Sequence, residues 1–174
     1  MRTSAILLAL FLLGATGCLG GDAEPTAPTL APGFRVLSTR IELPPKCRTD
    51  AVRERVVGAV EAFNLGRADS FADAFLETGQ LSPYGVGGRG FVGPAAIEGF
   101  VSERHKAGDG WTLTDLGPPR GTVGLPQEAA YGAGLIVQQE AAHFRRQENA
   151  KVVIECASGL IRAWVGPPFG PPPG

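Results

Sequence analysis

Residues 151–165, KVVIECASGLIRAWV, carry the pattern that decides the fold class. On each side of a short turn, ASG at 157–159, residues that favour a core alternate with residues that favour solvent. A period of two is typical of strands, because successive side chains point to opposite faces of a sheet. The stretch therefore predicts an antiparallel hairpin with strands over 151–156 and 160–165.

The sequence upstream of this hairpin adds further strands and, before them, helices. Residues 111–116 predict one strand, and residues 131–144 predict a long second strand. Earlier in the chain the apolar period becomes helical, which predicts helices over 49–66, 69–79 and 94–108. A chain with helices first and strands afterwards is typical of the α+β class, with an antiparallel sheet packed on helices.

The N-terminus resembles a bacterial lipoprotein signal. Arg2 supplies a positive charge, residues 5–13 form an apolar run too short to span a bilayer, and small residues precede Cys18. The resemblance implies that Cys18 is modified with a diacylglyceryl group and becomes the new N-terminus after cleavage. Ala15 stands where the usual pattern has leucine. The alternative is an ordinary secretory signal that is cleaved nearby.

The composition of the chain divides it into four predicted segments. These are a lipoprotein signal peptide over 1–17, a Pro-rich tether and lead-in over 18–46, a domain over 47–166, and a Pro/Gly-rich tail over 167–174. Two or three acyl chains hold a protein stably on a membrane. We therefore expect the lipid anchor to attach the protein to a membrane. The domain would then lie in the cell envelope, outside the cytoplasm.

Two more cysteines, Cys47 and Cys156, lie within the predicted domain. Secreted proteins reach a compartment that permits disulfides, so these two residues predict a single bridge. The bridge would close a loop of about 110 residues, which stabilises by roughly 4–5 kcal/mol if it acts through chain entropy. Two buried free thiols are the alternative.

Charge and ligand spacing argue against two classes of partner. The formal net charge is −1 with both signs interspersed, so nothing draws the chain to nucleic acid. Two distant cysteines and two scattered histidines, His105 and His143, lack the spacing of metal ligands, and we predict no metal site. The glycines of residues 85–90 match G-x-G-x-x-G but lack the strand–turn–helix context of a dinucleotide site, so we predict a loop there and no cofactor.

Three stretches resemble one family. They are AFNLGRAD at 62–69, GFVGPAAI at 90–97 and VIECASGLI at 153–161. In order and spacing they resemble the SnoaL-like branch of the nuclear transport factor 2-like (cystatin-like cone) superfamily, over about residues 50–166. The resemblance implies a curved antiparallel sheet wrapped around the N-terminal helices, forming a cone with a pocket at its open end.

Known members of this superfamily include isomerases, cyclases, dehydratases and non-catalytic binders, so the fold alone does not decide activity. An isomerase-type site needs a carboxylate after the second helix, yet no Asp or Glu occurs between Glu77 and Glu98. We therefore name no catalytic residue and lean towards a protein that is not an enzyme. An enzyme would have to use one of the remaining candidate carboxylates, which are Asp73, Asp115, Glu140 and Glu155.

Large aromatic residues are scarce and lie near the predicted strands and the mouth of the cone. They are the candidates for a pocket or an interface: Tyr84, Trp111, Tyr131 and Trp164. Strict alternation would place Trp164 with Arg162 on one face of its strand. It does not decide whether that face is the core, a pocket or an outer face that forms a homodimer.

Three functions remain open. The first is a non-catalytic envelope module that binds a small apolar ligand or a protein partner. The second is a SnoaL-type isomerase, cyclase or dehydratase with a pocket carboxylate, and the third is a purely structural interaction lipoprotein. A filled cone would exclude a ligand inside it, and carboxylates confined to solvent would exclude the enzyme.

Overall fold

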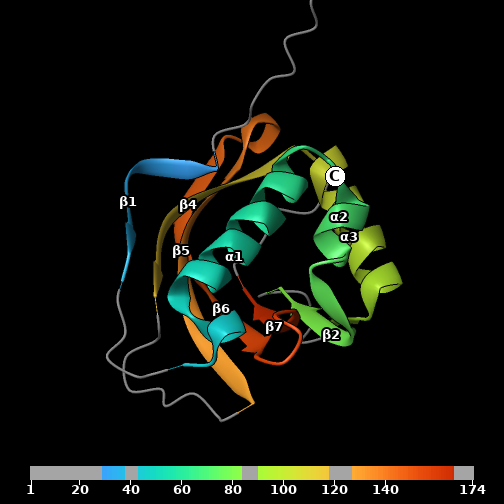
Figure 1. The fold of residues 1–174 in the computed structure, drawn as a ribbon. Helices are drawn as coiled ribbons and strands as arrows, with labels where there is room; N and C mark the ends of the chain where they lie inside the picture. The colour runs from blue at the N-terminus through green and yellow to red at the C-terminus, as the bar shows by residue number, and fades with distance from the viewer. Residues whose placement is uncertain (1–28, 38–42, 84–89, 118–126, 167–174) are drawn as a thin grey trace, which may run out of the picture.

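The computed structural model describes residues 29–37, 43–83, 90–117 and 127–166. Figure 1 shows one long helix lying across a curved sheet, with two shorter helices beside it. These helices are α1 (Thr49–Asn64), α2 (Ala68–Ala72) and α3 (Pro94–Lys106). None of the helices in the described ranges is both long and apolar enough to cross a membrane.

A sheet of seven strands forms the other layer, in the order β1-β4-β5-β6-β7-β2-β3. Its strands are β1 (Leu30–Val36), β2 (Phe75–Ser82), β3 (Phe91–Val92), β4 (Asp109–Gly117), β5 (Glu128–Gln139), β6 (Phe144–Glu155) and β7 (Ile161–Val165). The central pairs from β4 to β7 are antiparallel, whereas β1–β4 and β2–β7 are parallel. The predicted α+β class and the curved sheet around the helices are confirmed, with parallel pairs flanking the antiparallel centre.

Two predicted elements have the wrong extent. The helix predicted over 69–79 ends at Ala72, and Phe75 already pairs with Ile161 in the neighbouring strand β7. The strand predicted over 131–144 ends at Gln139, and the chain reverses through the short helix η2 (Glu140–Ala142). His143 closes that turn at φ 49°, a left-handed conformation in which a glycine would have been the usual signal.

A β-bulge breaks the alternation that the sequence predicts for β7. Val153 pairs with Ala163, but the next residue, Ile154, pairs with Ile161, so the register shifts by one position. Ile161 and Trp164 are consequently both buried, although strict alternation puts them on opposite faces. This is the physical reason why Trp164 does not share a face with Arg162.

The sheet starts earlier in the chain than the predicted domain boundary at residue 47. Strand β1 overlaps the stretch predicted as tether and pairs with β4 along the edge of the sheet. Its Phe34 ring also lies below the guanidinium of Arg53 on α1, 5.8 Å from the ring centroid.

The predicted disulfide between Cys47 and Cys156 is present in the structure, with 5.0 Å between the two Cα atoms. Cys47 ends the short helix η1 (Pro45–Cys47), so the bridge ties the start of α1 to the end of β6. The buried hydroxyl of Tyr131 donates a hydrogen bond to the carbonyl of Cys47. Two separate contacts therefore hold η1 against the sheet.

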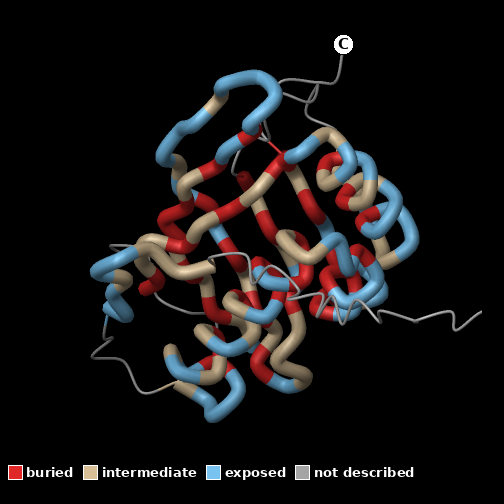
Figure 2. The backbone as a smooth tube through the Cα atoms, turned by 90° about the horizontal axis from the view of Figure 1, so that it is seen from above, coloured by how far each residue is buried: buried red, intermediate tan, exposed pale blue. Residues whose placement is uncertain are grey.

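Aromatic rings fill the space between α1 and the sheet. Phe63 of α1 stacks on Trp111 with 4.1 Å between ring centroids, and Trp111 stacks on Trp164 at 5.5 Å. Phe71 of α2 contacts all three rings. Figure 2 shows the buried residues concentrated on the inner sides of the elements. Rings of this size packed in contact make the inside of the cone a core.

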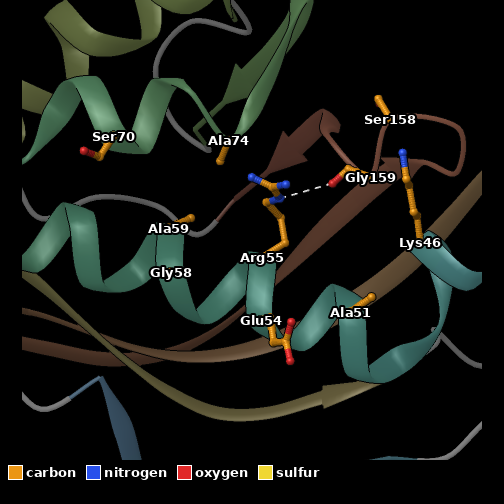
Figure 3. Close-up of a pocket in the computed structure, with 10 residues that line it drawn as sticks. All are labelled: Lys46, Ala51, Glu54, Arg55, Gly58, Ala59, Ser70, Ala74, Ser158 and Gly159. Atoms are coloured by element: carbon orange, nitrogen blue, oxygen red, sulfur yellow. Dashed lines mark hydrogen bonds between the residues drawn. The ribbon is translucent and has the colours of Figure 1, made fainter.

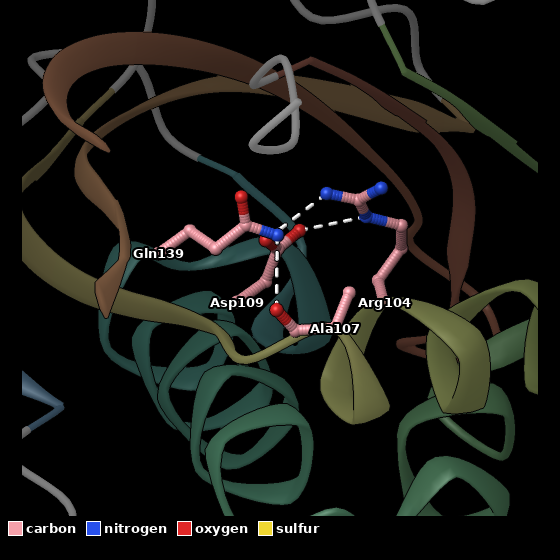
Figure 4. A network of polar contacts seen from close by, with 4 residues as sticks. All are labelled: Arg104, Ala107, Asp109 and Gln139. Carbon is pink, nitrogen blue, oxygen red and sulfur yellow. Dashed lines mark hydrogen bonds and ion pairs between the residues drawn. The ribbon is translucent and has the colours of Figure 1, made fainter. Parts of the chain in front are cut away.

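A buried ion pair closes the corner between α3 and β4 (Figure 4). Arg104 donates two hydrogen bonds to the carboxylate of Asp109, at 2.8 and 3.0 Å. The Gln139 side chain donates to the carbonyl of Ala107 at 3.0 Å, so β5 joins the same network. The charge of Asp109 is therefore buried and paired, as a buried charge must be.

Candidate functional site

The aromatic residues that the sequence singled out are core residues. Trp111, Tyr131 and Trp164 are 1%, 0% and 0% exposed, so none of them can form a surface interface. They also do not line the cleft described below. Tyr84 and Cys18 lie outside the described residues.

A cleft of about 510 Å³ lies beside α1, next to α2 and the turn between β6 and β7 (Figure 3). It is bounded by α1, by α2 with the start of β2, and by the turn between β6 and β7. The lining residues are Lys46, Ala51, Glu54, Arg55, Gly58, Ala59, Ser70, Ala74, Ser158 and Gly159. A volume of this size falls within the range of about 300–1,000 Å³ that small-molecule sites occupy.

Small side chains keep the cleft open. Ala51, Arg55 and Gly58 follow one another at three- and four-residue spacing, so they share one face of α1. A Cβ atom at Gly58 would have nothing within 4 Å. Ala59 and Ala74 are nearly buried and form the floor. The cleft exists because Ala51 and Gly58, on either side of Arg55, carry little or no side chain.

Two cations stand on the wall of the cleft beside the β6–β7 turn. The Lys46 Nζ atom donates a hydrogen bond to the carbonyl of Ala157 at 2.6 Å. The Arg55 Nε atom donates to the carbonyl of Gly159 at 3.1 Å, and Figure 3 shows the guanidinium extending toward that turn. The disulfide joins the residues next to Lys46 and Ala157 in the chain, so it fixes this wall covalently.

Neither cation forms an ion pair with a carboxylate of the described residues. Glu54 also lines the cleft, and Figure 3 shows its carboxylate pointing away from the Arg55 guanidinium. The nearby Glu155 carboxylate accepts a hydrogen bond from the Ser158 hydroxyl at 2.7 Å. The turn beside the cleft therefore carries two cations and the Glu155 carboxylate, and the described residues form no ion pair between them.

The four carboxylates proposed for an enzyme lie outside the interior of the cone. Asp73 and Glu140 are exposed at the ends of short helices. Asp115 lies over Gly134, where an added Cβ would come within 2.5 Å of its carboxylate oxygen, on the outer face of the sheet. Glu155 bonds the Ser158 hydroxyl at the β6–β7 turn. The structure brings none of them together.

The histidines take different positions. His105 packs edge-on against Phe63 with 6.5 Å between ring centroids and covers Gly66. His143 is exposed in the η2 turn. The described ranges contain no group of three or more His, Cys, Asp or Glu side chains that could hold a metal ion.

The outer face of the central sheet is the surface for which the sequence left a homodimer open. Ile136, Val153 and Ala163 lie on this face and are all partly exposed. No second copy is present, so dimerisation through this face stays a prediction.

Sequence reasoning missed Lys46, Arg55 and Gly58 as members of a site. One signal was available: a glycine in the middle of a helix costs about 0.5–1 kcal/mol relative to alanine, which suggests a reason for its presence. The contact between Lys46 and the β6–β7 turn could not be found in the same way, because 111 residues separate Lys46 from Ala157, whose carbonyl it contacts.

No protein-family model matches the sequence, and no curated protein sequence matches it as a relative. Solved structures do match. A cystatin-like protein of unknown function from Methylobium petroleophilum aligns with a TM-score of 0.57 and 19% identity, over 70% of this chain and 78% of the other. A nuclear transport factor 2-like protein from Novosphingobium aromaticivorans aligns with a TM-score of 0.52 and 17% identity, over 67% and 78%.

The Orange Carotenoid Protein of Anabaena, in a structure binding canthaxanthin, aligns with a TM-score of 0.51 and 17% identity. The match covers 74% of this chain but only 37% of the carotenoid protein. At such identities the comparisons establish the fold alone. The domain has the cystatin-like, nuclear transport factor 2-like fold, as the resemblance in its sequence implied.

Proposed function

We propose that this chain is a lipoprotein of the cell envelope whose domain binds a small ligand, without catalysis, in the cleft between α1, α2 and the β6–β7 turn. The observation that carries the proposal is the cleft itself, which has an open floor of small residues and a cationic wall formed by Lys46 and Arg55. Concave sites with a few placed polar groups are typical of ligand binding.

The inside of the cone is not the proposed site. Stacked rings of Phe63, Trp111 and Trp164 occupy it, so a ligand there would have to displace part of the core. The canthaxanthin-binding neighbour supports ligand binding by proteins that contain this fold. It does not support the same position for the ligand in this chain.

Native mass spectrometry of the protein purified from its own envelope tests the proposal. We expect the wild-type protein to carry a small molecule, and Gly58→Leu to lose it, because leucine fills open space in the cleft. Gly99→Leu is the matched control, since Gly99 is also an exposed helical glycine with nothing within 4 Å of an added Cβ.

Three outcomes have distinct meanings. Loss of the ligand in Gly58→Leu but not in Gly99→Leu supports the cleft. Retention in both variants would move the site elsewhere and contradict the proposal. A wild-type protein without any bound molecule would also contradict it and would favour a structural interaction role through the outer sheet face.

The envelope anchor needs its own test, because Cys18 lies outside the described residues. We expect the chain to incorporate a clickable fatty acid during growth and to sediment with membranes. Cys18→Ser should abolish both, because lipidation requires the thiol. Fatty-acid labelling that survives Cys18→Ser, or a wild-type chain that stays unlabelled, would remove the anchor from the proposal.

A further inference from the structure

We infer that the ligand of this cleft carries a carboxylate group, bound by the guanidinium of Arg55 with Lys46 as a second positive charge. The inference rests on the proposed function, because it names the chemistry of the molecule that the same cleft would hold. It depends on the orientation of two side chains and on the charges around them.

Arg55 is held in place before any ligand arrives. Its Nε atom is hydrogen-bonded to the Gly159 carbonyl at 3.1 Å, which limits rotation of the guanidinium. The two terminal nitrogens remain as a planar pair of donors, and the residue is half-buried beside the floor of the cleft. A planar fork of this kind fits the two oxygens of a carboxylate better than it fits a neutral group.

Lys46 adds a charge on the same wall. One of the three donors of its ammonium is used by the Ala157 carbonyl, which leaves two donors. Both cations thus bond neutral carbonyls of the same turn, and no carboxylate of the described residues pairs with them. Two like charges near one turn favour an anion between or beside them.

The rest of the cleft limits the size of the ligand. Ala59 and Ala74 form an apolar floor, and Gly58 leaves open space above it. This arrangement suits a short apolar chain that continues from the carboxylate. The inferred ligand class is therefore a small amphipathic carboxylate.

Hexanoate and its neutral amide, hexanamide, form a matched pair of probes for this inference. We would titrate each into the isotope-labelled full chain, with its disulfide intact, and follow backbone amide shifts by NMR. We expect hexanoate to shift residues around Arg55, Gly58 and Gly159 and to bind at least about tenfold more tightly than hexanamide. Inorganic phosphate, as a third probe, should bind more weakly than hexanoate.

Charge variants assign the effect to the wall of the cleft. Arg55→Gln should reduce hexanoate affinity about tenfold or more and leave hexanamide affinity unchanged. Arg53→Gln is the matched control, because Arg53 is on the same helix but faces Phe34 of β1. Lys46→Gln, at an exposed position, should weaken hexanoate binding by a smaller factor and serves if Arg55→Gln does not fold.

Each outcome separates this inference from the proposed function. Equal affinity for hexanoate and hexanamide, equal effects of Arg53→Gln and Arg55→Gln, or phosphate binding as tight as hexanoate binding would overturn the carboxylate class. In those cases ligand loss in Gly58→Leu would still uphold the cleft as the binding site. Ligand retention in Gly58→Leu would instead remove the cleft and the inference together.

Discussion

The two faces of helix α1 differ in what they do. One face points to the sheet and carries Val52, Val56 and Phe63, which are almost completely buried. The other face carries Ala51, Arg55 and Gly58 and lines the cleft. A single helix therefore separates a filled interior from an open surface site.

This difference shows where a cone of this kind keeps its stability and where it can bind. Large rings in contact stabilise the fold through burial and dispersion. The interior that they fill has little space for a ligand. Small residues on the cleft side contribute little packing and leave open space, and the Arg55 guanidinium beside them bonds only a carbonyl among the described residues. Substitutions on the two faces should consequently differ in both the size and the kind of their effects.

The largest effect should come from the interior. We expect Trp164→Ala to lower the free energy of unfolding by about 3–5 kcal/mol, because it removes a fully buried ring from the aromatic stack. Urea denaturation with the disulfide intact measures the change. Val92→Ala is the control, since Val92 is 60% exposed and should change stability by less than about 0.5 kcal/mol. A loss below about 1 kcal/mol for Trp164→Ala would mean that the interior is not packed as described.

The disulfide connects the two regions and should rank second. Replacing Cys47 and Cys156 together by serine should lower the free energy of unfolding by about 2–4 kcal/mol, because the bridge spans 109 residues. It should also weaken ligand binding, since the wall that bears Lys46 is no longer fixed. Thermal unfolding and the hexanoate titration measure the two effects. Cys18→Ser, outside the predicted domain, is the matched control and should change neither.

Tyr131→Phe should have a smaller effect that depends on pH. At neutral pH the loss of the hydrogen bond to the Cys47 carbonyl should lower stability by about 1 kcal/mol. Burial raises the pKa of the Tyr131 phenol above its usual value, a hydrogen bond with Thr49 lowers it, and the charge of Asp50 raises it. The net direction is upward.

A raised phenol pKa in the folded state makes the sign of the pH effect definite. As pH rises past about 10, the phenol of the unfolded chain ionises while the folded chain still holds its proton. The stability that Tyr131 contributes is therefore complete below that pH and falls as pH rises toward the folded pKa. Urea midpoints between pH 8 and 11 should show a steeper decline for wild type than for Tyr131→Phe, and equal slopes would contradict the assignment.

The smallest effect should come from the cleft and should have the opposite sign. Gly58→Ala should raise the free energy of unfolding by about 0.5–1 kcal/mol, because alanine favours the helix and its Cβ meets open space. Gly79→Ala should destabilise, since its Cβ would lie 2.8 Å from the Leu76 carbonyl oxygen. Thermal unfolding of both variants checks the contrast, and a destabilised Gly58→Ala would show that this face of α1 is packed.

Much of the fold could be predicted from the sequence. The first and third helices, the C-terminal hairpin and the Cys47–Cys156 bridge were all correct. The predictions failed where pairing with a distant strand outweighed the local pattern, as at Phe75, and where an ordinary residue, His143, took a conformation that usually signals glycine. Local patterns cannot report such cases, because their cause lies elsewhere in the chain.

The site could be predicted far less well than the fold. The aromatic residues chosen as pocket candidates are core residues where the structure describes them. Trp164 is one of them because a bulge in β7 turns it inward. The residues that line the cleft carry no motif. They come from η1, α1, α2 and the β6–β7 turn, and only folding brings these segments together.

The sequence by itself determined the class of fold, since hydrophobic period and turn chemistry are local properties of the chain. It also predicted which cysteines of the domain would pair, because the two allow only one intramolecular bridge, and the structure contains that bridge. The tertiary structure alone decided which side chains meet across α1: stacked rings on one face, and on the other two cations beside one turn. Contacts between distant residues depend on how whole elements pack, and a local pattern contains no record of that packing.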